Sequence, residues 1–287
     1  MRKSLTDGSQ DDSHAIRMLE GRTITAVVPA CNEAALIGGT LEAIPPYVDE
    51  VIVVDDGSTD GTVRAARDCS RTFDLVTHQT NLGVGAAIAS GCKRAAERGA
   101  DVAVVMAADG QMSPAGLRSV LRPLIDDQAD FVKGNRLAWP AARRQMPFPR
   151  WVGNHALSWL TRRALATQLG DSQCGYVAVN RHALRSVRWD ALWKGYGYPN
   201  DLLCEAMAHR LRIREVPVRP IYADERSGIR LRHALLVIPF VIARAWVRRR
   251  RSGAIEPAWP TSTSSTVMQT ASVRSPSCAT PTHDRAP

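Results

Sequence analysis

Short apolar segments that alternate with helix-like segments constrain this chain more than any other feature of its sequence. Residues 24–29 (ITAVVP) and 51–54 are near-continuous apolar runs, which are typical of parallel strands buried on both faces. The segment between them, residues 33–44, has apolar residues at helical spacing. This alternation predicts βαβ units and a mostly parallel central sheet flanked by helices. In such sheets ligands bind beyond the carboxyl ends of the strands, so we expect the chemistry in the strand-end loops.

The same reasoning predicts elements along most of the chain. Further strands are expected at 73–77, 102–106, 130–133, 176–180 and 213–218, and further helices at 60–69, 83–98, 114–126, 151–169, 182–187 and 201–211. Residues 137–149, which are rich in Pro, Ala and Arg, are expected to form a mobile loop. The chain carries no internal repeat.

Composition and chain ends narrow the class of protein. The net charge of +9 suits acidic partners, but for the charge alone a solvated basic surface is the favoured explanation. Residues 1–20 are polar and lack the apolar core of a secretion signal, and no stretch reaches the ~20 apolar residues of a membrane span. The six cysteines form no CxxC pair, so we expect reduced thiols and a cytoplasmic protein. Residues 252–287, rich in Ser, Thr, Pro and Ala, are expected to be disordered.

Carboxylates and amides follow several of the predicted strands. Asp109 comes just after the strand at 102–106, and Gln111 lies two residues on, so that both oxygens are expected to face one hard cation. The alternative is an Asp that caps a strand-to-helix turn. Asp55 and Asp56 end the strand at 51–54, where they are expected to accept hydrogen bonds from a ribose or a base. Here the alternative is an Asp/Gly turn that leads into a helix cap.

Two further loops complete the predicted donor edge of the sheet. Pro29 ends the first strand, and Asn32 and Glu33 open the following helix, whose free N–H groups favour an anion or a base. The segment NLGVGAA (81–87), which contains Gly83, looks like a phosphate loop but lacks both a Walker lysine and the GxGxxG spacing. By itself this last signal is weak.

Together these motifs resemble the family 2 glycosyltransferases of GT-A fold, and most closely the dolichol-phosphate-mannose synthase-like branch, which glycosylates polyprenyl phosphates. The matching segments are VVPACNE (27–33), VVDDGSTDGT (53–62), NLGVGAA (81–87), MAADGQM (106–112), VKGNR (132–136), DSQCGY (171–176) and EVPV (215–218). Their order and spacing also match, over roughly residues 22–232. The resemblance implies a GT-A nucleotide-diphospho-sugar transferase fold and transfer with inversion of configuration.

The resemblance also implies roles for individual residues. Those that would contact the nucleoside are Pro29, Asn32, Glu33, Asp55 and Asp56, with Gly83 also on the donor side. Asp109 and Gln111 would hold Mg²⁺ or Mn²⁺ against the diphosphate. The family usually carries Asp-x-Asp before this Gln, whereas here the first Asp is replaced by Ala107. We therefore expect either a weaker metal site or a protein that binds the donor without turnover, and we favour the first. Cys31 stands where relatives often have an aromatic residue, which puts stacking on the base in doubt.

Cationic residues in the second half of the chain predict an acceptor site. Arg136 and Arg150 resemble the arginines that hold the acceptor phosphate in the polyprenyl-phosphate branch, Asn154 lies one turn after Arg150, and Arg226 with Ser227 resembles its acceptor loop. The alternative for each is surface ion pairing. A phosphate acceptor needs no general base, and no His is placed to serve as one. Asp201 would orient the acceptor, act as a base towards a hydroxyl acceptor, or cap the helix that it opens.

Residues 233–251 combine a short apolar body, one Trp and four consecutive arginines. They fit an amphipathic helix at an anionic membrane surface, or equally a helix packed on the core. A nucleic-acid partner is not expected, because aromatic interleaving and DNA-binding motifs are missing. The predicted organisation is a leader (1–20), a GT-A domain (21–232), a membrane-proximal helix (233–251) and a disordered tail (252–287). The predicted activity is transfer from a UDP- or GDP-sugar to a polyprenyl-phosphate lipid on the cytoplasmic face of the membrane. Alternatives are a hydroxyl acceptor or an inactive nucleotide-sugar-binding regulator.

Overall fold

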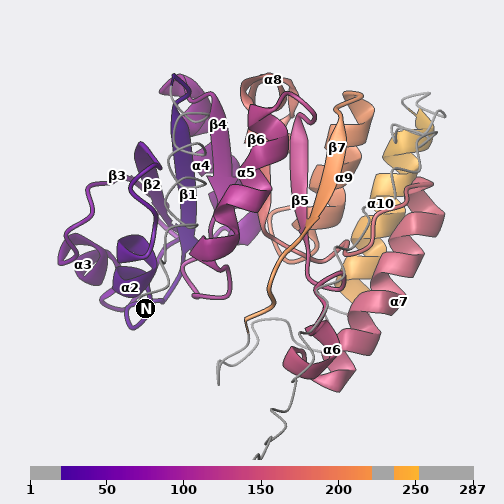
Figure 1. Cartoon of the computed structure of the whole chain (residues 1–287), viewed down its shortest axis with the longest axis horizontal. Helices are drawn as coiled ribbons and strands as arrows, with labels where there is room; N and C mark the ends of the chain where they lie inside the picture. Colours follow the sequence, from indigo (N-terminus) through magenta and orange to yellow (C-terminus); the bar gives the residue numbers. More distant parts are fainter. Residues whose placement is uncertain (1–20, 222–235, 252–287) are drawn as a thin grey trace, which may run out of the picture.

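The computed structural model describes residues 21–221 and 236–251 (Figure 1). The predictions made for the leader, for Arg226 and Ser227, and for the tail lie outside the described residues. The strands are β1 (Ile24–Ala30), β2 (Glu50–Asp55), β3 (Asp74–Thr77), β4 (Val102–Val105), β5 (Phe131–Asn135), β6 (Val177–Asn180) and β7 (Ile213–Pro217).

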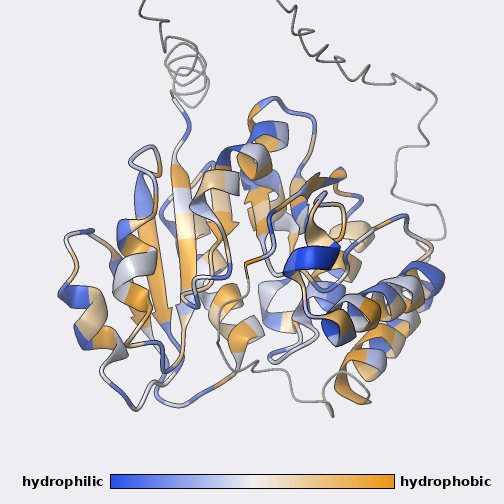
Figure 2. Ribbon diagram, turned by 60° about the horizontal axis from the view of Figure 1, so that its bottom comes forward, coloured by the Kyte–Doolittle hydropathy of each residue, from blue (hydrophilic) through white to orange (hydrophobic). Residues whose placement is uncertain are grey.

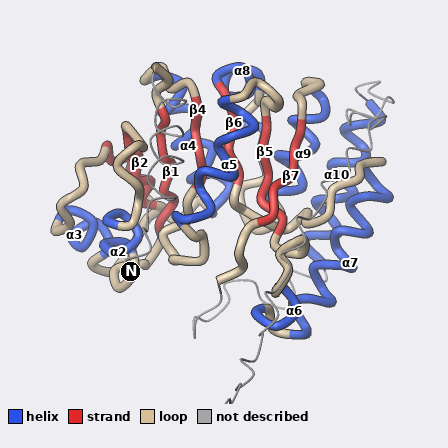
Figure 3. Tube along the Cα trace, in the orientation of Figure 1, coloured by secondary structure: helices blue, strands red, loops and turns tan. Residues whose placement is uncertain are grey.

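These strands form one sheet in the order β3-β2-β1-β4-β6-β5-β7 (Figure 3). Within it β6 runs antiparallel to both of its neighbours, β4 and β5, and every other described pairing is parallel. The register pairs Ala30 with Asp55 and Val27 with Val105, so β1, β2 and β4 end at the same edge of the sheet. This confirms the predicted mostly parallel α/β architecture and gathers the strand-end loops on one side.

Helices cover both faces of the sheet. They are α2 (Ile37–Glu42), α3 (Thr62–Arg67), α4 (Val84–Glu97), α5 (Leu117–Ile125), α6 (Ala142–Gln145), α7 (Phe148–Leu165), α8 (Arg181–Ser186), α9 (Tyr198–Ala208) and α10 (Ile238–Arg251), with 3-10 turns η1 (Pro114–Gly116) and η2 (Trp189–Ala191). Apolar residues of α4, α8 and α9 share one core with the sheet, and those of α2, α3 and α5 share the other. Gly91 lets α4 lie directly on the sheet, because a Cβ there would overlap the Val27 side chain.

Several helix boundaries differ from the sequence prediction because of contacts between distant residues. The first helix begins at Ile37, since the residues before it are bonded to the loop after β2. The expected loop at 137–149 contains α6 and the start of α7. In α9 the first residue is Tyr198, three residues before the predicted start at Asp201. Local apolar spacing therefore predicted the elements, but tertiary contacts set their ends.

The helix α10 packs on the body of the protein beside α7 and α9, beyond the β7 edge of the sheet (Figure 1). Its inner face buries Ile238, Val241, Ile242 and Ala245. One of the two interpretations left open by the sequence, a helix packed on the core, is thus observed for this face. In the ranges 21–221 and 236–251, no helix combines the length and the apolar character that a bilayer crossing requires.

Candidate active site

A cavity of about 190 Å³ opens at the carboxyl edge of the sheet. The turn after β4 supplies one wall, with Asp109 and Gln111, and the end of β5 supplies Arg136. The lining also includes Tyr196 and Tyr198, before and at the start of α9, together with Ile238 of α10. The carboxylate of Asp109, the amide of Gln111 and the guanidinium of Arg136 therefore line one space.

Asp109 and Gln111 are held in one tight turn. The Gln111 backbone N–H donates to Asp109 Oδ1 at 3.0 Å, and both side chains line the cavity. Ala107 lines the same cavity. Within the described part of the chain, no group of three or more His, Cys, Asp or Glu side chains has metal-binding geometry. A carboxylate and an amide oxygen on one wall fit a hard divalent cation that takes its other ligands from a diphosphate and water.

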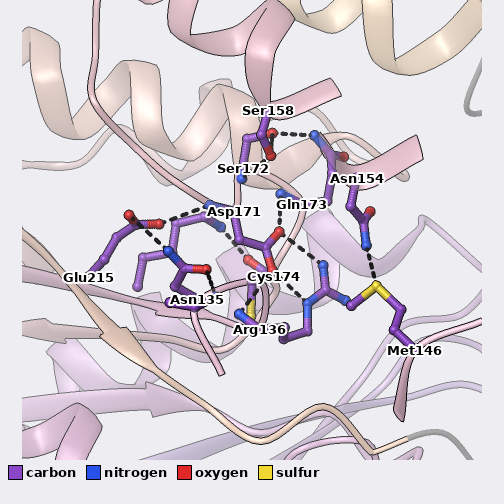
Figure 4. A network of polar contacts seen from close by, with 12 residues as sticks. Asn135, Arg136, Met146, Asn154, Ser158, Asp171, Ser172, Gln173, Cys174 and Glu215 are labelled. Atoms are coloured by element: carbon purple, nitrogen blue, oxygen red, sulfur yellow. Dashed lines mark hydrogen bonds and ion pairs between the residues drawn. The ribbon is translucent and has the colours of Figure 1, made fainter. Parts of the chain in front are cut away.

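Arg136 is fixed by a buried carboxylate. Its Nε and Nη2 donate to the two oxygens of Asp171 at 2.8 and 3.1 Å, and its backbone N–H donates to the same group at 3.1 Å (Figure 4). Burial alone would raise the pKa of Asp171, but the charges of Arg136 and Lys133 hold that pKa below its ordinary value. The ion pair expected as an alternative to phosphate binding thus exists for Arg136, and its partner is the buried Asp171.

Around this pair lies a polar network that sequence reasoning did not assign. Glu215 of β7 accepts hydrogen bonds from the N–H groups of Gly170 and Asp171 at 2.7 and 3.1 Å (Figure 4). Lys133 is fully buried and donates through Nζ to the Cys174 carbonyl. Desolvation lowers the pKa of Lys133, partly offset by Asp171 and Glu215. This network ties β5, β7 and the 170–174 loop into a rigid support for Arg136.

Asn32 and Glu33, two of the predicted donor contacts, lie in a loop that is bonded to the turn after β2. Asn32 has a left-handed backbone with φ of 57°, and its Oδ1 accepts from the Thr59 N–H at 2.9 Å. The Glu33 N–H donates to Thr62 Oγ1 at 2.8 Å, so it is not a free donor for a ligand. The Asn32 side chain is exposed and that of Glu33 is half-buried, and both remain candidates for donor contact.

The other predicted donor carboxylates are buried. Asp55 and Asp56 are only 4% and 2% exposed, and Pro29 is buried within β1. Asp56 accepts from the N–H groups of Leu82 and Gly83 at 2.9 and 2.7 Å, and it contacts His78 Nδ1 at 2.7 Å. Three hydrogen-bonding contacts of Asp56 are therefore made within the protein, and this residue has a structural role in addition to the ribose or base contact that was predicted.

Gly83 requires a correction. Its N–H donates to Asp56, and the N–H groups of Gly85 and Ala86 in the next turn donate to the Lys194 carbonyl at 2.6 and 3.2 Å. The backbone N–H groups of the loop that resembled a phosphate-binding loop are therefore hydrogen-bonded within the protein. Gly83 is needed for geometry instead, because φ is 99° and a Cβ would lie 2.6 Å from the Lys194 oxygen.

Tyr196 connects the two halves of the site and was missed by sequence reasoning. It lines the cavity, and 36% of it is exposed. Desolvation raises its pKa, and the charges of Cys31, Asp109 and Glu33 raise it further. The tyrosine thus lies within electrostatic range of both the loop after β1 and the turn after β4. Two tyrosines separated by one glycine just before a predicted helix were the available signal.

Asp201 lies outside the cavity. Its side chain is fully buried in the first turns of α9, where it binds Arg244 at 2.7 Å and Arg248 at 3.0 Å and accepts from the Trp193 N–H at 2.8 Å. The helix is capped by Gly197 rather than by Asp201. The predicted cap is therefore corrected, and the ion pairs with two guanidinium groups, away from the cavity, argue against the predicted catalytic role.

Arg150 and Asn154 lie in the N-terminal half of α7 and do not contribute to the cavity wall as described. Asn154 Nδ2 donates to the Met146 sulfur at 3.5 Å (Figure 4). Of the predicted acceptor residues, only Arg136 is therefore brought to the cavity, since Arg226 and Ser227 lie outside the described residues.

The fold has a close parallel among solved structures. Glucosyl-3-phosphoglycerate synthase from Mycobacterium tuberculosis, in complex with Mn²⁺, UDP and glucosyl-3-phosphoglycerate, superposes with a TM-score of 0.61. The two proteins are 23% identical, and the match covers 88% of this chain and 86% of that one. At this identity the likeness shows the fold alone. The sheet and the cavity at its carboxyl edge thus define a protein of the GT-A glycosyltransferase fold.

Sequence relatives narrow the class. Residues 25–188 match the model of glycosyl transferase family 2. A UDP-N-acetylglucosamine–dolichyl-phosphate N-acetylglucosaminyltransferase from Methanococcus voltae is 32% identical over 219 residues, which are 71% of this chain and 87% of that protein. A polyprenol monophosphomannose synthase from Mycolicibacterium smegmatis is 31% identical over 255 residues, or 85% and 93% of the two chains. The chain belongs to glycosyl transferase family 2, and its relatives confirm the resemblance to the polyprenyl-phosphate branch.

Proposed function

We propose that this protein transfers a sugar, with inversion, from a UDP- or GDP-sugar to the phosphate of a polyprenyl lipid. The observation that carries the proposal is the common cavity of Asp109, Gln111 and Arg136. It supplies ligands for a cation on one wall and a phosphate-binding guanidinium on another. The relatives in Methanococcus voltae and Mycolicibacterium smegmatis are named for sugar transfer to dolichyl phosphate and to polyprenol phosphate, which supports the acceptor class.

Asp109 and Gln111 would hold Mg²⁺ or Mn²⁺ on the donor side. When bound, the ion would neutralise charge on the diphosphate and make it a better leaving group. Among the described residues that line the cavity, Asp109 is the one carboxylate, and Ala107 occupies the position of the second. The donor diphosphate itself and water would then complete the coordination, so we expect metal binding to be weak without the donor.

Arg136 would bind the acceptor phosphate, and Asp171 would hold its guanidinium in orientation. An oxygen of the acceptor phosphate attacks the anomeric carbon from the face opposite the leaving diphosphate. One carbon–oxygen bond forms while the bond to the diphosphate breaks, and no proton has to be removed from an already anionic nucleophile. This explains why the buried and ion-paired Asp201 is not needed as a base.

The exposed loop after β1 would contact the nucleoside. Asn32 and Glu33 offer the side chains, and Asp56 acts indirectly by fixing the 82–83 turn. Tyr196, which lies within electrostatic range of Glu33 and Asp109, would contact the donor between its nucleoside and its diphosphate. The relatives differ in the sugar that their names specify, so the proposal covers both UDP- and GDP-sugars.

The test is transfer of labelled sugar from UDP- and GDP-sugars to undecaprenyl or dolichyl phosphate in detergent, with and without Mn²⁺. The expected product partitions into organic solvent and is cleaved by mild acid. Asp109→Ala is expected to lower turnover by about 10²-fold or more, corresponding to several kcal/mol of transition-state stabilisation. The matched control is Asp68→Ala, because that carboxylate is 72% exposed at the C-terminal end of α3 and is not among the residues that line the cavity.

A second candidate, an inactive nucleotide-sugar-binding regulator, is favoured by one observation, the alanine at position 107. Thermal shift with UDP-, GDP- and dTDP-sugars distinguishes the two. Strong stabilisation by a nucleotide-sugar, with no transfer to lipid phosphates, glycans or water at any Mn²⁺ concentration, would support the regulator and contradict transfer. Product from a glycan hydroxyl alone would identify the hydroxyl-acceptor alternative.

A further inference from the structure

Two neighbouring helices carry most of the large apolar side chains that the described residues expose. Of nine such side chains, seven lie on α7 or in and just before α10. They are Phe148, Val152 and Trp159 on α7, and Leu236, Phe240, Trp246 and Val247 at α10. Four of them are more than half exposed: Phe148 at 64%, Trp159 at 58%, Leu236 at 70% and Phe240 at 58%. Exposed apolar surface is thus concentrated at one end of the molecule rather than scattered, as single residues normally are.

The spacing of these residues gives each helix one apolar stripe. Phe148, Val152 and Trp159 are separated by four and seven positions, as are Leu236, Phe240 and Val247, so each set lies on one helix face. The opposite faces are packed, with Leu165 of α7 and Val241 of α10 fully buried. The exposed stripes are therefore second apolar faces on helices whose first face already serves the core.

The charge of the same region has a single sign. Residues 137–169 and 236–251 contain no Asp or Glu, but each range contains five arginines. Arg244 and Arg248 turn inward to Asp201 and Glu205, which neutralise them. Arg250 lies on the outside, with its guanidinium 4.0 Å from the Trp246 ring centroid. Aromatic side chains paired with cations on an acid-free surface suit the boundary between anionic headgroups and acyl chains.

We propose that the outer stripes of α7 and α10 form a docking surface for an anionic lipid bilayer. An apolar stripe and a basic surface together provide the two signals that stable peripheral attachment requires. Ile238 at the start of α10 lines the active-site cavity, so docking through α10 brings the cavity next to the bilayer. That a lipid acceptor enters there rests on the proposed function, whereas the docking itself does not.

The test is sedimentation of the full chain with vesicles of phosphatidylcholine alone and of phosphatidylcholine with phosphatidylglycerol. We expect binding to the anionic vesicles that weakens as salt is raised, because the electrostatic part is screened. The double variant Trp159→Ser/Phe240→Ser is expected to lower the partition coefficient by about tenfold or more, since two exposed aromatic anchors are lost. Leu82→Ser is the matched control, because Leu82 is 44% exposed elsewhere on the surface and its loss should leave vesicle binding unchanged.

Each outcome has one meaning. Absence of binding to anionic vesicles, or binding that the double variant leaves intact, would overturn the proposal. A dimer of the wild type in light scattering that becomes a monomer in the double variant would identify the face as an interface between copies instead. Thermal unfolding of each variant excludes loss of fold as the cause. Vesicle binding without any sugar transfer would contradict the proposed function but would still support the docking surface.

Discussion

Arg244 of α10 binds Asp201 of α9 at 2.7 Å, and through this pair the last described helix is joined to the wall of the active site. Asp201 also accepts a hydrogen bond from the N–H of Trp193. Trp193 lies shortly before Tyr196 and Tyr198, the two tyrosines that line the cavity. The Trp193 ring in turn contacts Phe240 of α10, with the ring centroids 5.8 Å apart. The ribbon of the long helices α7 and α10 at this end of the molecule carries both hydrophobic and hydrophilic residues (Figure 2). The position of the cavity wall thus depends on α10.

This relationship predicts that Asp201→Asn acts through stability. The amide cannot neutralise Arg244 and Arg248, so we expect the free energy of unfolding in urea to fall by about 2 to 4 kcal/mol, somewhat below a fully buried pair because both arginines are partly exposed. Arg244→Met, which removes the same contact from the other side, should also destabilise the protein. A variant Asp201→Asn of unchanged stability but with kcat lowered by orders of magnitude would instead restore the catalytic interpretation.

The missing carboxylate at position 107 leads to a second prediction. Ala107 lines the cavity beside Asp109, so an added carboxylate there would face the same cation. Ala107→Asp is expected to lower the Mn²⁺ concentration for half-maximal donor binding by about tenfold, which corresponds to about 1.4 kcal/mol. Titration of Mn²⁺ in the presence of UDP measures this half-maximal concentration, and Ala107→Asn controls for the change in side-chain volume. Equal effects of both variants would argue against a cation at this wall.

Gly83 gives a prediction that is independent of function. Gly83→Ala places a methyl group 2.6 Å from the Lys194 oxygen at a φ of 99°, so both strain and collision destabilise the variant. Gly99→Ala is the matched control, because Gly99 has a φ of 83° and open space around its Cβ position. We expect a loss of about 1 kcal/mol for Gly99→Ala and about 2 to 3 kcal/mol for Gly83→Ala, by urea unfolding. Equal losses would mean that the loop moves away freely.

Asp130 predicts how stability depends on pH. Burial alone would raise the pKa of this carboxyl, but hydrogen bonds from Arg212 and Asn180 lower it from 3.8 to about 2. Since the folded pKa lies below the unfolded value, the stabilisation is complete above pH about 4 and is lost as the pH falls towards about 2. The contribution is about 2 kcal/mol. Urea unfolding at several pH values measures it, and Asp130→Asn should flatten the curve in this window. An unchanged slope in the variant would show that other carboxylates cause the acid sensitivity.

Local patterns in the sequence determined the succession of strands and helices along the chain. They also determined the edge of the sheet at which Asp109, Gln111 and Arg136 meet. Apolar runs such as 24–29 can only be buried within a sheet, and parallel strands bring their carboxyl ends to one side. The motifs that the chain shares with known glycosyltransferases also predicted its family. What the sequence could not decide was which polar groups are already used inside the protein.

Tertiary structure decided the partners, because these lie far apart along the chain. Asp56 accepts hydrogen bonds from the N–H groups at positions 82 and 83, and Asp201 is paired with the arginines at 244 and 248. The same carboxylate in the same local sequence would face a ligand if those partners were absent. Tyr196 and Ile238 join the cavity wall for the same reason, since helix packing rather than local spacing brings them there. A residue's neighbours along the chain thus predicted where it lies, and only its neighbours in space fixed what it does.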